Sequence, residues 1–269
     1  MNVVSRLRAR GGGLAFQTGA YSISGIVNRG ASFLLIPVYT HLLTVAEYGL
    51  LVSLFFTVQV LLPIVKFGQP DGLVRFLPEL EIKQHSGALL SISTILLLGL
   101  GVGILLALQP LRLPLAEIYQ QDRGRTGQLL ALVGALTAAH AWFVLMSSYY
   151  RARRLPAPFV LVSVIVAGLL LFGTVGGLTL IEASVEMVLI VHALAYGLLA
   201  TAGSVWPFRR EGFAWDRKLC TRLVAFCAPL SLADSGRVAI DLATLYSLGL
   251  FADPELVGVY ALGLTLARI

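Results

Sequence analysis

The sequence predicts an all-α, polytopic transmembrane helix bundle, and three observations indicate it. Hydrophobic residues make up 57% of the 269 residues and charged residues 13%, whereas about 25% of a soluble domain is charged. Mean hydropathy is +0.85. The apolar residues gather in runs long enough to cross a bilayer as helices, without the ten-residue alternation of a membrane β-barrel. The net charge of +6 lies in short loops rather than in a basic domain, so no nucleic-acid partner is expected.

Seven full spans and part of an eighth follow one another along the chain. Helices are expected because only they, or a closed barrel, satisfy every backbone group within the membrane. The last apolar run is too short to cross a bilayer, so we expect a fragment of a longer protein or the product of a truncated gene. The predicted spans are 14–40, 47–65, 87–109, 127–150, 157–181, 187–206 and 224–250, with 256–269 cut short.

The distribution of basic residues predicts which side each loop faces. Of the 20 Lys and Arg residues, 14 fall in the N-terminal tail and in the alternate loops that share its side, and three fall in the loops opposite. Cytoplasmic loops of membrane proteins are enriched in these residues. We therefore expect the N-terminus to be cytoplasmic.

The first span carries a charge near its middle. Asn28 and Arg29 interrupt 27 almost entirely apolar residues, and Arg29 lies 11 residues or more from either end of the span. At this depth a lipid-facing arginine costs at least about 2.5 kcal/mol. Other helices should therefore surround Arg29, either as part of a binding site or in contact with helix carbonyls, Asn28 or Gln59.

The seventh span repeats the layout of the first. Both spans follow basic residues, both carry a central arginine (Arg29 and Arg237), and both end in an acidic turn, at 43–49 and 252–260. Six helices separate the copies, so the repeat is parallel, with its axis along the membrane normal. We expect a six-helix N-terminal bundle over 1–206, a cytoplasmic interfacial linker over 207–222 with several aromatic and basic residues, and the first helices of a second, truncated bundle over 223–269.

Several further polar residues lie within or beside the spans. Asp234 and Asp241 share a helix face with Arg237, either as a self-neutralised strip or as carboxylates that exchange a coupling ion. His140 is mid-span and could bond a neighbouring helix or relay protons, whereas His192 is expected at the interface. Gln59 could bind sugar hydroxyls or join helices.

Three short motifs resemble one known family. Residues 44–50 (Thr-Val-Ala-Glu-Tyr-Gly-Leu), residues 67–76 (Phe-Gly-x-x-x-Gly-Leu-Val-Arg-Phe) and residues 258–260 (Gly-Val-Tyr) are similar to the polysaccharide flippases. These are the Wzx-type oligosaccharide transporters of the multidrug/oligosaccharidyl-lipid/polysaccharide exporter superfamily. The resemblance implies two bundles of six helices around a central cavity, in the plasma (inner) membrane.

The resemblance also implies a substrate, an oligosaccharide linked to polyprenyl diphosphate, which is moved outward by alternating access for surface polysaccharide, including lipopolysaccharide. Arginine suits a diphosphate because its planar fork binds phosphate oxygens in pairs and stays protonated. Arg29, Asn28, Gln59 and Arg237 are therefore the expected substrate-binding residues. Arg75 could contact a phosphate at the membrane surface or simply anchor the loop.

The remaining expectations follow from the same resemblance. Asp241, Asp234 and His140 are candidates for coupling a proton or sodium ion. Other partners would be membrane lipids and polysaccharide assembly proteins, with no cofactor, no metal and no catalytic residue. The alternatives are a cation-coupled multidrug exporter of the same superfamily, for which Arg29 is unfavourable, and a truncated protein that does not transport. A membrane enzyme is disfavoured because neither paired carboxylates nor a long catalytic loop is present.

Overall fold

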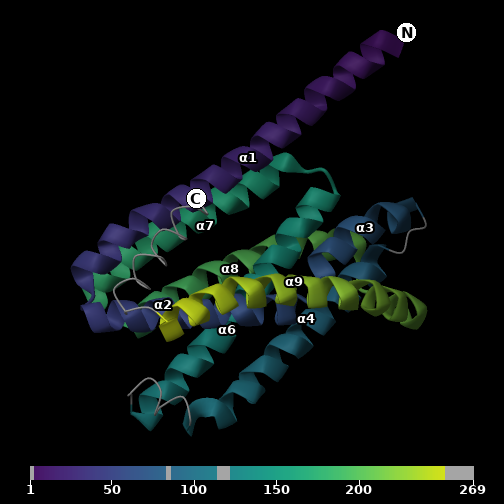
Figure 1. Ribbon diagram of the computed structural model, residues 1–269. Coiled ribbons are helices and arrows are strands. Elements are labelled where there is room, and N and C mark those ends of the chain that lie inside the picture. The colour runs from purple at the N-terminus through teal and green to yellow at the C-terminus, as the bar shows by residue number, and fades with distance from the viewer. Residues whose placement is uncertain (1–2, 83–85, 114–121, 252–269) are drawn as a thin grey trace.

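The fold is built from helices alone over the residues that the computed structural model describes, which are 3–82, 86–113 and 122–251 (Figure 1). The predicted all-α class is therefore confirmed. The expected turn at 252–260 and the partial span 256–269 lie outside the described residues. The helices are α1 (Val3–Leu42), α2 (Val45–Lys66), α3 (Gln69–Ile82), α4 (Ser86–Leu108), α6 (Arg123–Ala152), α7 (Pro156–Gly176), α8 (Val185–Glu211) and α9 (Arg217–Phe251), with a 3-10 turn η1 (Gln109–Leu111) and a π turn η2 (Gly177–Ile181).

Six stretches of the described residues are long and apolar enough to cross a membrane, which makes the chain a multi-pass membrane protein. The first predicted span, 14–40, lies within the single long helix α1, and the six stretches correspond to the later predicted spans. The stretches are Ala46–Leu80, Ser86–Leu111, Arg123–Ala152, Pro156–Ile181, Val185–Glu211 and Arg217–Ile240.

Local sequence explains where α2 begins and ends. Thr44 and Glu47 form a capping box, in which the Glu47 backbone N–H donates to Thr44 Oγ1 at 3.3 Å and the Thr44 backbone N–H donates to Glu47 Oε2 at 3.1 Å. At the other end, Phe67 (φ +47°) and Gly68 (φ +64°) adopt left-handed conformations that stop the helix. The chain therefore forms two helices, α2 and α3, where the apolar run could have continued as one helix.

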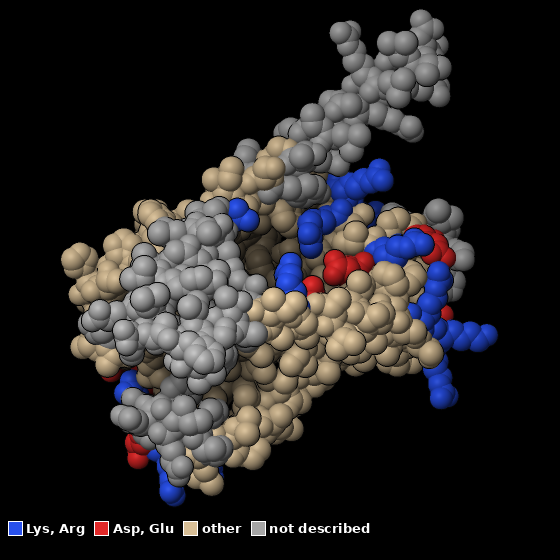
Figure 2. Space-filling model, in the orientation of Figure 1, with Lys and Arg blue, Asp and Glu red and all other residues tan. Residues whose placement is uncertain are grey.

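The helices pack around α6, which contacts α2, α3, α4 and α8. Helix α7 packs on α8 and carries α1 along its length, so α1 lies at the edge of the bundle (Figure 1). Figure 2 shows a hollow beneath α1, with Lys and Arg side chains at its rim. Helices α2, α4, α6 and α8 therefore form a compact group, and α1 and α7 pair at its edge.

Two segments between the predicted spans are largely helical. Most of 67–83 forms α3, which buries Leu73 and Leu77 completely. Of the expected linker 207–222, only 212–216 lies outside helices, because α8 continues through Pro207 to Glu211 and α9 begins at Arg217. Phe213 and Trp215 in this short linker are exposed.

The ends of α6 and α8 and the start of α4 meet at one end of the bundle, which we call the basic end because the Arg-rich loops lie there. Glu211 accepts hydrogen bonds from Ser86 and Tyr149, the latter at 2.6 Å, and forms an ion pair with Arg153. The side chains of Arg153 and Glu211 are each only 5% exposed. This buried cluster ties three helices together at the end that the basic residues predict to be cytoplasmic.

Candidate functional site

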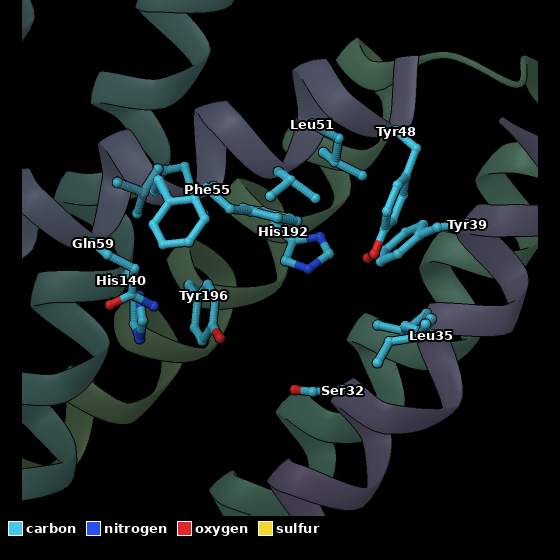
Figure 3. Close-up of a pocket in the computed structure, with 15 residues that line it drawn as sticks. Ser32, Leu35, Tyr39, Tyr48, Leu51, Phe55, Gln59, His140, His192 and Tyr196 are labelled. Atoms are coloured by element: carbon cyan, nitrogen blue, oxygen red, sulfur yellow. The ribbon is translucent and has the colours of Figure 1, made fainter. Parts of the chain in front are cut away.

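A cavity of about 400 Å³ opens between α1, α2, α6 and α8 (Figure 3). Its wall combines apolar side chains with seven polar but uncharged ones. The apolar wall is formed by Leu35, Ile36, Leu51, Val52, Phe55, Phe56, Val58 and Leu136, and the polar groups belong to Ser32, Tyr39, Tyr48, Gln59, His140, His192 and Tyr196. Such a volume is typical of small-molecule sites.

The polar groups of the cavity include both donors and acceptors of hydrogen bonds. The hydroxyl groups of Tyr39 and Tyr48 point into the opening in Figure 3. The rings of His140 and Tyr196 are stacked, with centroids 4.3 Å apart, and His192 packs against Phe55 with centroids 5.2 Å apart. Hydroxyl, amide and neutral imidazole groups each bring donor and acceptor capacity. The wall can therefore bind an uncharged, hydroxylated ligand.

Tyr39 and His192 line the cavity but also interact within the protein. The Tyr39 side chain is 7% exposed, and its hydroxyl interacts with that of Thr174 on α7. His192 has its Nδ1 2.9 Å from the carbonyl oxygen of Val188, one helical turn earlier.

Arg29 and Asn28 lie one turn from the cavity along α1. Arg29, Ser32 and Ile36 are spaced at i, i+3 and i+7, so they share one side of the helix, and the latter two line the cavity. The Asn28 side chain donates to the Ser24 carbonyl oxygen at 2.9 Å, and the Asn28 carbonyl accepts from Ser32. Among the described residues the Arg29 side chain is exposed rather than surrounded, because α1 packs chiefly on α7.

The candidates on α9 are arranged differently from the expected strip. Asp234 forms an ion pair with Lys66 of α2, at 3.6 Å between Nζ and Oδ2, so its partner comes from another helix. Arg237 is exposed, and the Asp241 side chain lies outside the described residues. Arg75 is exposed on α3, away from the cavity wall. The structure thus brings Gln59 and His140 together in the cavity and leaves Arg237 and Arg75 apart from it.

Comparison with known families shows the family to which the chain belongs. A family model described as "Polysaccharide biosynthesis protein" matches residues 14–269. The chain belongs to this family. No curated protein matches it. The resemblance found in the three motifs is therefore confirmed.

The fold of this family member is also seen in a solved structure, entitled "Outward-facing conformation of a multidrug resistance MATE family transporter of the MOP superfamily". The TM-score is 0.75 at 16% sequence identity, and the match covers 94% of this chain and 60% of that chain. The likeness shows a common fold, and the chain spans 60% of the length of that transporter.

Sequence reasoning missed several cavity residues of this family member. His192, which was predicted near the membrane interface, lies two turns inside α8, is 9% exposed and lines the cavity. Tyr39 and Tyr196 were not singled out, because a tyrosine in an apolar run fits a helix interface equally well. The spacing of Asn28, Ser32 and Tyr39 at i, i+4 and i+11 is the pattern that could have found the α1 wall.

Within the described part of the chain, no three His, Cys, Asp or Glu side chains form a group that could hold a metal ion. The cavity wall likewise contains no Asp, Glu, Lys or Arg. The arrangement can bind a ligand. Neutral polar groups line the cavity, and Arg29, a permanent cation, lies one turn away along α1.

Proposed function

We propose that the chain is part of a flippase that moves an oligosaccharide linked to polyprenyl diphosphate outward across the membrane, by alternating access, during surface polysaccharide biosynthesis. The observation that carries this proposal is the neutral, hydroxyl-lined cavity placed beside Arg29 on α1. Family membership and the transporter fold support it.

The two parts of this site match the two parts of such a substrate. A sugar presents hydroxyl edges and an apolar ring face, and the cavity offers Tyr39, Gln59 and His140 together with aromatic walls. A diphosphate needs a cation, and Arg29 precedes Ser32 by three helical residues, about 4.5 Å of rise. The substrate would place sugar in the cavity and phosphate at Arg29, with Asn28 beside it and Arg237 approaching from α9.

Coupling to an ion remains part of the proposal. His140 in the cavity and Asp241 on α9 are the groups that would exchange a proton or bind sodium. Asp234, already paired with Lys66, would act only when that pair separates. Membrane lipids and polysaccharide assembly proteins are the proposed partners, and the cytoplasmic N-terminus in the inner membrane is the proposed orientation.

A cation-coupled multidrug exporter is the second candidate, because the solved structure with the same fold is named as a multidrug resistance transporter. A cationic drug in a cavity of low dielectric is best stabilised by a nearby carboxylate. The cavity wall contains no carboxylate, and Arg29 would repel the drug. The flippase is therefore the better fit.

The test is complementation in cells whose surface polysaccharide depends on this gene. We expect Arg29→Ala to lower surface polysaccharide about 10-fold or more, because a charge-assisted hydrogen bond contributes about 1.5–3 kcal/mol. Arg29→Lys should retain part of the output, and Tyr39→Phe should lower it without changing charge. Arg217→Ala, which removes an exposed arginine at the start of α9, is the matched control. Full polysaccharide output from Arg29→Ala, at equal protein level, would refute the proposal.

A further inference from the structure

We propose that the end of α8 and the linker that follows it bind the headgroups of anionic phospholipids at the basic end of the bundle. The surface consists of Trp206, Arg209 and Arg210 of α8 and of Phe213 and Trp215 in the linker 212–216, and we call it the headgroup surface. It lies apart from the cavity, and its binding of lipid does not depend on the proposed function.

The aromatic side chains of the headgroup surface are exposed although they are large. Trp206 is 43% exposed, Phe213 72% and Trp215 54%. Phe213 and Trp215 lie outside the helices, and the part of the chain that the structure describes leaves most of their area uncovered. Aromatic side chains collect at membrane–water interfaces, where acyl chains cover the ring and the polar edge of a tryptophan reaches water.

The length of α8 brings these residues to the level of the headgroups. The helix has 27 residues, or about 40 Å at 1.5 Å per residue, whereas the hydrocarbon core of a bilayer is about 30 Å thick. Its last turns, which carry Trp206, Arg209 and Arg210, therefore extend beyond the hydrocarbon. The next candidate span begins directly after the linker, so Phe213 and Trp215 lie at the same level.

Trp206 and Arg210 are held in place by neighbouring side chains. The Arg210 guanidinium lies over the Trp206 ring, 5.3 Å from its centroid. The same ring packs on α6, stacked on Tyr150 with centroids 6.4 Å apart and edge-on to Tyr149 at 6.2 Å. Tyr149 is itself fixed by its hydrogen bond to Glu211. Less conformational entropy is lost on binding when the arginine and the aromatic ring are already ordered.

The positive charge of the headgroup surface is not cancelled within the protein. Glu211, the carboxylate next to Arg210, is paired with the buried Arg153 and lies 3.7 Å from Arg210 Nε. The Arg210 side chain is 50% exposed, and Arg209 is exposed as well. Asp216 of the linker accepts a backbone N–H at the start of α9 at 2.8 Å. Two guanidinium groups therefore remain to bind phosphate oxygens, which they do in pairs.

These features favour a lipid over a protein as the occupant. Lys and Arg side chains project from the end of the molecule where α8 and α9 join (Figure 2). Basic residues beside exposed aromatic residues, next to a spanning helix, are typical of segments that bind anionic leaflets. A protein–protein interface takes about 20–30 residues on each side, many more than this surface offers. A lipid needs only a phosphate at the arginines and acyl chains at the rings.

Tryptophan fluorescence provides the test, because brominated acyl chains quench the tryptophans that they contact. In the 269-residue chain, Trp142→Phe leaves Trp206 and Trp215 as the only tryptophans. In phosphatidylcholine bilayers, brominated phosphatidylglycerol should quench them with an apparent affinity about 5-fold or more above that of brominated phosphatidylcholine. The preference should approach equality in Arg209→Gln combined with Arg210→Gln, and in the unaltered surface at high salt.

The matched control removes two exposed arginines from the opposite end of the bundle. Arg112→Gln combined with Arg123→Gln should leave the preference for phosphatidylglycerol unchanged. Equal quenching by the two lipids, or a preference that survives the loss of Arg209 and Arg210, would overturn the proposal. Quenching by neither lipid would also overturn it and would indicate that protein covers the surface.

Thermal unfolding in detergent measures the same binding without fluorescence quenching. Phosphatidylglycerol in the micelles should raise the melting temperature roughly 2 °C or more above that in equal phosphatidylcholine, because a ligand of the folded state stabilises it. The variant without Arg209 and Arg210 should lose this difference. The same difference in that variant, or an equal rise with inorganic phosphate alone, would contradict a lipid site. Neither measurement uses the transported substrate, so failure of lipid binding and failure of Arg29→Ala to lower polysaccharide are separate results.

Discussion

Among single residues, Glu211 has the most consequential contacts outside the cavity. Its carboxylate receives the Ser86 and Tyr149 hydroxyls and the Arg153 guanidinium, and it is almost entirely enclosed. Tyr150 beside it donates to the Gly203 carbonyl oxygen at 2.7 Å. Removing one member of a buried pair leaves the other charge without compensation, which costs more than the pair contributes.

We therefore predict that Glu211→Met lowers the free energy of unfolding by about 3–5 kcal/mol. Arg153→Met should do the same, and the double variant should be more stable than either single variant, because no lone charge remains. Thermal unfolding of the purified protein in detergent measures this. Additive losses in the double variant would show that the two side chains do not act as a pair.

The chemistry of each side chain also determines which cavity residues could be predicted from the sequence. Gln59 and His140 were singled out because a polar side chain inside an apolar span needs a reason, and both line the cavity. The hydroxyl of Tyr39 was invisible to that argument, because tyrosine is at home in apolar surroundings. Arg29 was expected to be enclosed; its exposure depends on α1 lying along α7, which is a matter of packing that no local pattern specifies.

At the scale of elements, the start of α4 and the end of α8 meet at Gly87. A Cβ built on Gly87 would collide with the Glu211 carbonyl oxygen and lie 3.0 Å from that of Gly212. Both obstacles are backbone atoms, which cannot rotate away as a flexible side chain can. The close approach of α4 and α8 therefore requires glycine at this position.

The corresponding prediction is that Gly87→Ala destabilises the protein by about 1–3 kcal/mol, the usual cost of overpacking. Gly103→Ala, in the same helix but with open space around its Cβ position, should be neutral or slightly stabilising, because alanine favours helix. Melting temperatures of the two purified variants give the comparison. Equal melting temperatures would show that α4 can move away from α8 without cost.

Helix α3 forms although its sequence contains Pro70, Gly72 and Pro78, which local rules associate with turns. Pro70 lies in the first turn, where its missing N–H breaks no hydrogen bond, and Gly72 is explained by the close approach of Cys227 on α9. The glycine in this segment is therefore required by a contact between helices, whereas local sequence rules associate it with a turn.

For the whole molecule, the side of the membrane on which each loop lies is still a prediction. In a Cys220→Ser, Cys227→Ser background, we expect Phe213→Cys to react with an impermeant maleimide only in inside-out vesicles and Leu113→Cys only in intact spheroplasts. Both positions are exposed, at 72% and 49%. The opposite labelling pattern would invert the orientation and place the basic end of the bundle on the outer side.

The position of Glu211 along the chain has a consequence for how the protein is made. Arg153 precedes it by 58 residues and Ser86 by 125, so α4 and α6 leave the ribosome before their shared carboxylate exists. Until α8 is complete, Arg153 must remain in contact with water or lipid headgroups. The contacts that join α4, α6 and α8 at Glu211 therefore form late in synthesis, and the α9 residues that dock on α3 are translated immediately afterwards.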